Sequence, residues 1–231
     1  MKPNTNSVVA WQSPKLQLII TGLNASSNRK TGNMVQSYIL RRDVSPLTAL
    51  ATNSDKSICG SCPLKGATVN GKRTGRTCYV NVGQGAQQTW NNQSNFAGNT
   101  DAITGRVLRL GSYGDPAFVP ITVWRKLIVK SRGHTGYTHQ WRKVTAQPYR
   151  AIVMASVESP ATKADANSRG WRTFRVMRQN ESLQHDEILC PASEEAGKRT
   201  TCENCQLCSG NAIKAKNVAI YAHSANKVNL K

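Results

Sequence analysis

Seven cysteines fall into two separate sets along this 231-residue chain, and their spacing constrains the fold more than any other feature. The first set is C-x2-C-x15-C, made of Cys59, Cys62 and Cys78. The second set is C-x11-C-x2-C-x2-C, and its members are Cys190, Cys202, Cys205 and Cys208. A C-x2-C pair brings two thiolates onto one tight turn, within reach of a single ion or cluster. The spacing therefore predicts two loops that bind metal.

The second set predicts a closed metal centre, because four thiolates complete a tetrahedral Zn²⁺ site or hold a [4Fe–4S] cluster. Redox-active or free thiols are the alternative for this set. The first set has three thiolates, which leaves one coordination position open for chemistry. A closed zinc site with His134, His139 or His223 as fourth ligand is one alternative there, and a merger of the two sets is another.

The cysteines are expected in a reducing compartment. The chain has no run of the roughly 18–20 apolar residues that a membrane span needs. Its first residues, Met1 to Asn6, are polar and lack the apolar region of a signal peptide. We therefore expect a cytoplasmic protein with no membrane partner, in which clustered cysteines favour metal ligation over disulfides.

Basic residues outnumber acidic ones by 31 to 12, which gives a formal net charge of +19. Hydrophobic residues still make up 39% of the chain, so this is not a disordered basic tail. The excess favours nucleic acid as partner, since Lys and Arg that neutralise phosphates release condensed counterions. A soluble protein with a basic surface is the alternative. The residues expected to contact nucleic acid are Arg125, Lys126, Lys130, Arg132, Arg142, Lys143, Arg150 and Arg172.

Aromatic residues adjoin several of these basic residues, as in Trp124-Arg125, Trp141-Arg142 and Trp171-Arg172. Such rings can stack on bases beside a basic groove, although packing in the core is the alternative. One acidic stretch, residues 181–195, contains no Lys or Arg and surrounds Cys190. The charge pattern thus predicts a polyanion-facing surface with a separate metal-bearing lobe.

Hydrophobic periodicity predicts an α/β fold, a partial (β/α) barrel-like arrangement with a mainly parallel sheet. The expected strands are 16–20, 34–40, 106–111, 134–141, 151–156, 171–176, 187–190 and 217–222, and the expected helices are 84–96, 159–169 and one that begins near Pro120. The first two strands form an N-terminal β-hairpin. We expect one domain over 1–231, with a β-extension at 1–50 and a βα core at 51–224. The second cysteine set lies in a metal-binding insertion near the C-terminus.

Reactive groups of a parallel sheet gather beyond the carboxyl ends of its strands. Polar clusters follow several expected strands, including 112–115, 137–139, 156–158, 190–193 and His223-Ser224. Tyr113, Asp115 and His139 are the candidate catalytic residues. A turn-capping role for Asp115 and an ordinary hydrogen-bonded role for His139 are the alternatives.

Two further enzyme classes have weaker support. Asp115 with Glu158 can bind a divalent metal in a nuclease, and Tyr113, Tyr137 or Tyr149 can serve a nickase as nucleophile. The metal-binding H-x-H pair of rolling-circle nickases is missing, however. P-loop and G-x-S-x-G motifs are missing too, which excludes P-loop ATPases and serine hydrolases of the elbow type.

Several motifs occur in a specific order over about residues 58–224: Cys59-Gly-Ser-Cys62-Pro, Cys78-Tyr79-Val, 109–116, 136–141, 170–176, and 190–197 with the last three cysteines. In this order they resemble an uncharacterised family of phage- and prophage-encoded cysteine-cluster proteins. The three-cysteine segment ahead of a βα series is also remotely similar to radical-SAM barrels.

The resemblance implies that the first cysteine set holds a [4Fe–4S] cluster whose unique iron binds S-adenosylmethionine, and that the second set holds an auxiliary cluster. Gly111, Ser112 and Gly114 then take the place of the glycine-rich segment that contacts S-adenosylmethionine. We expect a phage or mobile-element metalloprotein that acts on or binds nucleic acid in a bacterial host cell, as a radical-SAM-like iron–sulfur enzyme. The alternative is a non-enzymatic, zinc-stabilised DNA- or RNA-binding protein associated with replication.

Overall fold

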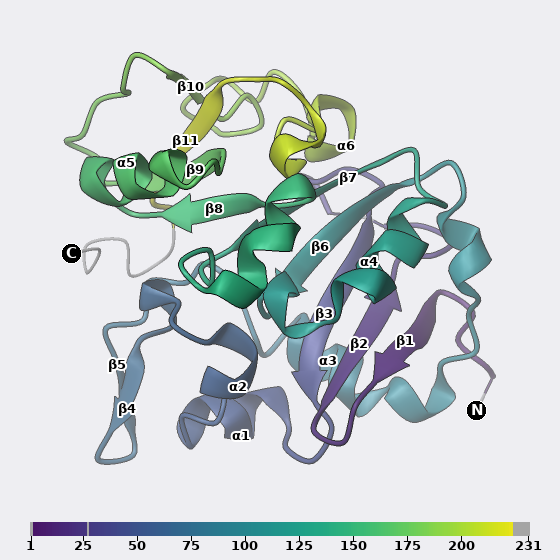
Figure 1. Ribbon diagram of the computed structural model, residues 1–231. Helices are drawn as coiled ribbons and strands as arrows, with labels where there is room; N and C mark the ends of the chain where they lie inside the picture. Colours follow the sequence, from purple (N-terminus) through teal and green to yellow (C-terminus); the bar gives the residue numbers. More distant parts are fainter. Residues whose placement is uncertain (1, 27, 224–231) are drawn as a thin grey trace.

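A computed structural model describes residues 2–26 and 28–223 of the chain, so Ser224, part of one expected polar cluster, lies outside the described residues. Nine of the described strands form one sheet, in the order β1-β2-β3-β6-β7-β8-β9-β11-β10 (Figure 1). Its strands are β1 (Ser7–Gln12), β2 (Leu16–Thr21), β3 (Val35–Arg41), β6 (Val107–Tyr113), β7 (Gly133–Thr138), β8 (Met154–Val157), β9 (Thr173–Met177), β10 (Glu187–Leu189) and β11 (Asn217–Tyr221). A separate hairpin consists of β4 (Ala67–Val69) and β5 (Lys72–Thr74).

The helices are short and connect these strands. They are α1 (Pro46–Ala51), α2 (Lys56–Cys59), α3 (Ala86–Asn91), α4 (Ile121–Ile128), α5 (Pro160–Ser168) and α6 (Cys202–Cys205). Turns of 3₁₀ helix lie at η1 (Pro63–Lys65), η2 (Gln93–Asn95), η3 (Thr100–Ile103), η4 (Pro116–Phe118), η5 (Val144–Ala151) and η6 (Gly210–Ala212). In the described residues, no helix is long and apolar enough to cross a membrane.

The sheet has an antiparallel part and a parallel part that meet at β3. Strands β1, β2 and β3 are antiparallel neighbours, whereas each pair from β3 to β10 along the sheet is parallel. The expected α/β fold with a mainly parallel sheet and an N-terminal hairpin is confirmed. Because β1 and β10 stand at the two ends of the strand order, a barrel-like arrangement stays a prediction.

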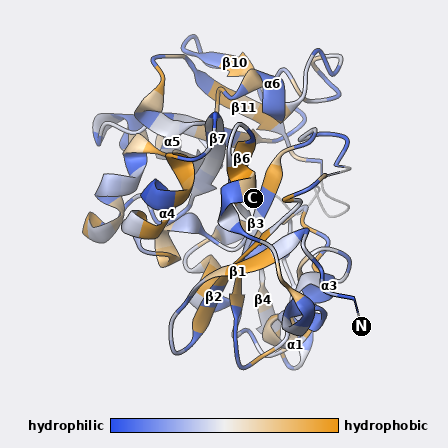
Figure 2. Cartoon of the chain, turned by 90° about the vertical axis from the view of Figure 1, so that its right-hand side faces the viewer, coloured by the Kyte–Doolittle hydropathy of each residue, from blue (hydrophilic) through white to orange (hydrophobic). Residues whose placement is uncertain are grey.

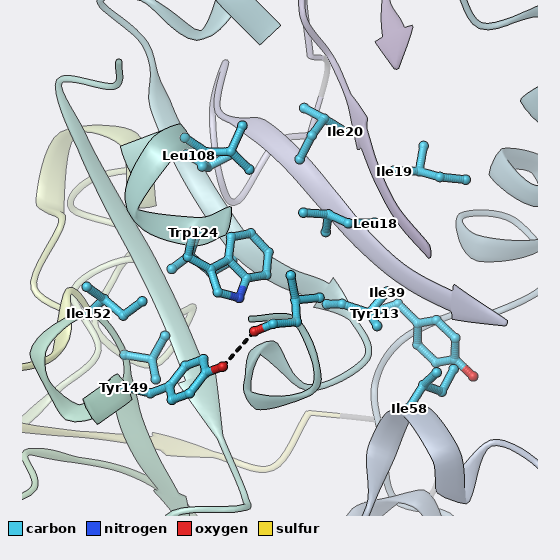
Figure 3. Packing of buried hydrophobic residues seen from close by; sticks show 14 of the residues in the cluster. Leu18, Ile19, Ile20, Ile39, Ile58, Leu108, Tyr113, Trp124, Tyr149 and Ile152 are labelled. Carbon is cyan, nitrogen blue, oxygen red and sulfur yellow. Dashed lines mark hydrogen bonds between the residues drawn. The ribbon is translucent and has the colours of Figure 1, made fainter. Parts of the chain in front are cut away.

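One face of the parallel part packs against helices. Leu108 and Leu110 of β6 are buried together with Trp124 of α4, and Trp124 is fully buried (Figure 3). Close to this cluster, the Tyr149 hydroxyl donates a hydrogen bond of 2.6 Å to the Val119 carbonyl, so this buried polar group is satisfied (Figure 3). Hydrophobic colour is prominent on the strands of the sheet (Figure 2).

Local sequence explains where the two main connecting helices begin. Pro120 precedes α4, and apolar residues at 121, 124, 127 and 128 give that helix its buried side. Ser159 caps α5: its hydroxyl accepts from the Thr162 amide (3.2 Å), while the Thr162 hydroxyl accepts from the Ser159 amide (3.1 Å). Both helices were expected, and both are confirmed.

Candidate functional site

The second face of the parallel sheet lines a cavity of about 480 Å³. Side chains alternate between the two faces of a strand, so every second residue points toward this cavity. Arg109 and Tyr113 of β6, Tyr137 of β7 and Val176 of β9 are among the lining residues. Loops that follow the strands complete the wall, and they bring all seven cysteines to the same cavity. The two cysteine sets therefore meet in space although the chain separates them widely.

The first set is carried by α2 and the segment after it. Cys59 ends α2, and the Cys62 amide donates to the Cys59 carbonyl (3.2 Å), which forms the tight turn expected for C-x2-C. The β4–β5 hairpin fills the spacer before Cys78, whose amide donates to the Leu64 carbonyl (2.9 Å). Burial raises the pKa of Cys59, and the neighbouring Cys62 and Cys78 raise it further. The three thiols of the first set thus line the cavity and lie near enough to affect one another's pKa.

The second set lies in the connection from β10 to β11. Cys190 directly follows β10, while Cys202 and Cys205 are the first and last residues of α6. The Cys208 carbonyl accepts from the Gly136 amide of β7 (2.9 Å), which ties the connection to the middle of the sheet. Burial raises the pKa of Cys208 to about 12, although the Tyr137 side chain acts in the opposite direction.

No disulfide joins any two of the seven cysteines, all of which the structure describes. Within residues 2–26 and 28–223, no three Cys, His, Asp or Glu side chains converge closely enough to hold one metal ion as they stand. The thiols of each set do influence one another, since Cys202 raises the pKa of Cys205 and of Cys190. Both sets therefore have the right chemistry, but the metal centres expected from the sequence stay a prediction.

Asp115 organises the loop that follows β7. Its Oδ1 accepts from the Thr138 hydroxyl (2.7 Å) and the Ala117 amide (3.0 Å), and its Oδ2 accepts from the His139 amide (2.8 Å). Gln140 Nε2 is a fourth donor at 3.3 Å. The carboxylate is buried and fully engaged. It positions its neighbours in this structure, and a direct role in catalysis stays a prediction.

His139 is held between a carboxylate and a thiol. Its Nε2 lies 2.8 Å from Glu158 Oε1 and 3.8 Å from Cys62 Sγ. Burial opposes protonation of the ring, but Cys62 and Glu158 outweigh it and raise the pKa of His139 well above its usual range. Of the three histidines expected as a fourth ligand, His139 lies beside Cys62 of the first set. His223 also lines the cavity and contacts the ring of Tyr79, whereas His134 is buried outside the cavity lining.

Tyr113 lines the cavity and is 4% exposed. Its hydroxyl has no hydrogen-bond partner among the described residues. Burial raises the pKa of this phenol, and the nearby Cys59 raises it further. A neutral, deeply buried phenol is a poor nucleophile, so the geometry does not favour the nickase alternative at Tyr113.

Gly111, Ser112 and Gly114 also line the cavity, at the carboxyl end of β6. Gly111 and Gly114 have φ of +74° and +82°, a region that favours glycine. A Cβ at Gly114 would lie 2.7 Å from the Ile39 carbonyl, which shows how closely two backbones approach there. The Ser112 hydroxyl donates to Gln36 Oε1 (2.7 Å). The three residues share the cavity with the first cysteine set, and a cofactor-binding role stays a prediction.

The basic residues expected to contact nucleic acid lie outside the cavity. None of those eight described residues lines it. Arg125, Lys126 and Lys143 are exposed, whereas Lys130, Arg132 and Arg142 pair with carboxylates. Arg150 is exposed and donates to the Arg169 carbonyl (3.3 Å).

Arg172 has a structural role in the loop that carries Cys208. Its guanidinium donates to four backbone carbonyls, those of Leu207, Gly210, Ala215 and Lys216, at 2.6 to 3.0 Å. These bonds fasten the end of the cysteine-rich connection to β9. A phosphate would have to compete with them, so Arg172 contributes to the fold of the second cysteine set in this structure.

The expectation that aromatic residues beside basic ones stack on bases is wrong for the three tryptophans. Trp124 is fully buried, and Trp141 and Trp171 are 1% and 2% exposed. Their indole N–H groups donate to Pro116, Ser156 and Gln147 inside the protein. A ring buried to this extent cannot stack on a base, so these residues stabilise the core.

Sequence reasoning assigned no role in the site to Arg109, Thr135 or Tyr79, which all line the cavity. The sequence held one signal for Arg109, a charged residue inside the apolar strand Val107-Leu-Arg-Leu110.

Comparison of the chain with protein-family models, with curated proteins and with solved structures found no match. The functional argument therefore rests on the geometry of the cavity.

Proposed function

We propose that this chain is a cysteine-ligated metalloprotein whose two centres face one cavity, and that it acts there as a radical-SAM-like iron–sulfur enzyme. One observation supports this proposal above all: both cysteine sets line the same cavity beyond a parallel sheet. A purely structural zinc site needs no cavity. Two centres beside a cavity of about 480 Å³ leave room for a small-molecule substrate or cofactor.

The donor chemistry fits such centres. Cysteine thiolates are soft ligands that suit iron–sulfur clusters and zinc. Cys59, Cys62 and Cys78 would hold the first centre with one position open, and the four cysteines of the second set would hold a closed one. When bound, an iron–sulfur cluster supplies single electrons to a molecule beside it. The spacer of the first set differs from the C-x3-C-x2-C of most radical-SAM proteins, and the β4–β5 hairpin accounts for its extra length.

The protein's own residues would position the reactants. Asp115 fixes the backbone of the loop after β7, which places His139 beside Cys62. Glu158 Oε1 accepts from or shares a proton with His139 Nε2 at 2.8 Å and so sets the orientation of the ring. In this arrangement His139 can move a proton at Nε2. If the first centre binds zinc, the same nitrogen would have to exchange its hydrogen bond to Glu158 for the metal to act as fourth ligand.

The test is the metal content of protein purified without oxygen. Several irons and sulfides per chain, with visible absorption, are expected. Cys62→Ser should remove the first centre alone and Cys202→Ser the second alone, while the neighbouring Ser61→Ala should leave both in place. A colourless protein that contains zinc only, or no metal at all, would refute the iron–sulfur proposal.

A zinc-stabilised nucleic-acid-binding protein is the second candidate, and one observation favours it. Arg125 and Lys126 lie exposed on α4, and neither pairs with a carboxylate of the described chain. With a net charge of +19, the protein should bind DNA or RNA with an affinity that falls steeply as salt rises. The double variant Arg125→Gln/Lys126→Gln should reduce the slope of log K against log salt by up to about 2 if both contact phosphates. Absence of binding at low salt would refute this candidate.

A further inference from the structure

Arg109 is a buried cation on the cavity face of the sheet. It lies in the middle of β6, is 8% exposed, and lines the cavity. Burial of a guanidinium is unfavourable unless an anion or several acceptors compensate the charge. The partners of Arg109 therefore show whether the protein itself supplies that compensation.

The described partners of Arg109 are neutral. Its Nη2 donates to the Tyr79 hydroxyl at 2.6 Å, and its guanidinium carbon lies 5.8 Å from the centre of the Tyr137 ring. No carboxylate in residues 2–26 and 28–223 forms an ion pair with it. Asp115, the one acidic residue in the described wall, is fully engaged by other donors. The positive charge of Arg109 thus faces the cavity without a carboxylate partner from the described chain. The ionisable groups that act on it are Tyr79, Tyr137, Cys202 and Cys208.

A second polar group beside Arg109 also lacks a partner. Arg109 pairs in register with Gln36 of β3 on one side and with Thr135 of β7 on the other, so the three residues form a row across the sheet. Gln36 is engaged by Thr31, Met34 and Ser112. Thr135 is 2% exposed and lines the cavity, yet its hydroxyl has no hydrogen-bond partner within the described chain. Buried hydroxyls are normally hydrogen-bonded, so this one is an unused donor.

We propose that Arg109 and Thr135 form an oxyanion site, which binds the carboxylate or phosphate group of a small ligand inside the cavity. A guanidinium presents two parallel N–H donors to such a group, and the adjacent hydroxyl adds a third. The charge of the cavity wall also favours an anionic ligand. Among the described residues, the wall contains three basic side chains, Lys30, Lys65 and Arg109, and one acidic side chain, Asp115. This inference goes beyond the proposed function, because it concerns a ligand and requires no metal.

The walls around this site suit the rest of an organic ligand. The Tyr137 and Phe174 rings both line the cavity with centroids 4.2 Å apart, and the Tyr137 ring lies beside Arg109. The volume of about 480 Å³ is in the range of sites that hold small organic molecules. Tyr79 stacks on His223 with ring centroids 5.1 Å apart and is half exposed, so these two rings stand where the cavity meets solvent.

Thermal unfolding with inorganic phosphate and with acetate tests this site, against sodium chloride at the same ionic strength. An anion that binds only the folded protein raises its Tm. We expect a rise for the wild type with at least one of the two anions, and no rise for Arg109→Met. Without an oxyanion, Arg109→Met should have a Tm equal to or above that of the wild type, because it removes an uncompensated buried charge. A larger response to phosphate than to acetate assigns the site to phosphates, and the reverse assigns it to carboxylates.

Two further variants locate the effect. Thr135→Val, which keeps the shape of the side chain, should bind the preferred anion several-fold more weakly, whereas exposed Arg150→Met should respond as the wild type does. An unchanged response in Arg109→Met, or no response of the wild type beyond that to chloride, would overturn the proposal.

Metal content measured on the same samples separates this proposal from the proposed function. If Arg109→Met loses metal from the second cysteine set while neither oxyanion affects the wild type, the guanidinium balances a metal–thiolate charge and the oxyanion site is refuted. A protein without metal that still responds to phosphate through Arg109 would refute the metal centres and support the oxyanion site.

Discussion

Replacement of Glu187 by Ala should strongly destabilise the C-terminal part of the sheet. Arg175 of β9 and Glu187 of β10 form an ion pair in which both side chains are 0% exposed. The pair is bidentate: Arg175 Nε donates to Oε1 at 2.8 Å and Nη2 to Oε2 at 2.7 Å. Glu187 also accepts from the Gln184 amide at 2.8 Å. The variant leaves a guanidinium buried without its main anion.

The expected loss of unfolding free energy is about 3–5 kcal/mol, the usual cost of breaking a buried pair from one side. For a chain of this size, that corresponds to a fall in Tm of roughly 6–20 °C. Arg175 keeps two weaker acceptors, the Ser182 carbonyl at 2.9 Å and Glu181 at 3.4 Å. These two contacts favour the lower end of the expected loss of 3–5 kcal/mol, that is, about 3 kcal/mol.

Urea unfolding followed by tryptophan fluorescence measures this loss. The double variant Arg175→Met/Glu187→Leu should recover most of it, since apolar residues of similar volume often replace a buried pair at little cost. Glu194→Ala is the control: its pair with Lys198 is exposed on both sides (80% and 65%), so its midpoint should match the wild type. A loss below about 1 kcal/mol for Glu187→Ala would refute the view that this buried pair depends on both partners.

Three further variants test other parts of the structure. Ser159→Ala removes the cap of α5 and should cost about 1 kcal/mol in urea unfolding. Burial lowers the pKa of His134, so the unfolded state takes up the proton first and the wild type should lose unfolding free energy as pH falls below about 6.5. His134→Gln should show a smaller loss between pH 7 and 5. A variant with the same pH profile as the wild type would contradict this. Arg172→Met should speed tryptic cleavage after the exposed Lys214, because it removes the contacts to the carbonyls of this loop. The control Arg178→Met, at an exposed residue, should be cleaved as slowly as the wild type. If Arg172→Met is also cleaved at the wild-type rate, the carbonyl contacts do not hold the loop.

The βα series was predictable because each element has a strong local signal. The run from β6 to β9 shows apolar strands, a Pro120 start for α4 and a Ser159 cap for α5, and the structure places these elements within a few residues of the expected bounds. Strand β1 was not expected, because most of its residues are only half buried and its sequence shows little periodicity. A short hairpin such as β4–β5, with two of three residues exposed in each strand, gives an equally weak signal.

The candidate site was only partly predictable, because it depends on long-range pairing. Spacing alone identified the cysteine sets, but their meeting at one cavity follows from the strand order. Which face Arg109 occupies cannot be known until the register of β6 with β3 and β7 is known. The tryptophans show the opposite difficulty: a Trp-Arg pair has the same sequence on a surface and in a core, and only burial distinguishes them.

The strand order at one edge of the sheet also has a consequence for how the protein is made. Strand β11 lies between β9 and β10, although β10 precedes it in the chain. During synthesis, β10 and Cys190 therefore emerge before the strand that will hold them, and this edge is completed last. Closing the connection of residues 190–216 costs loop entropy, and an ion bound by four thiolates within it would shorten the loop. If the proposed second centre forms, metal binding would lower the entropic cost of completing this edge.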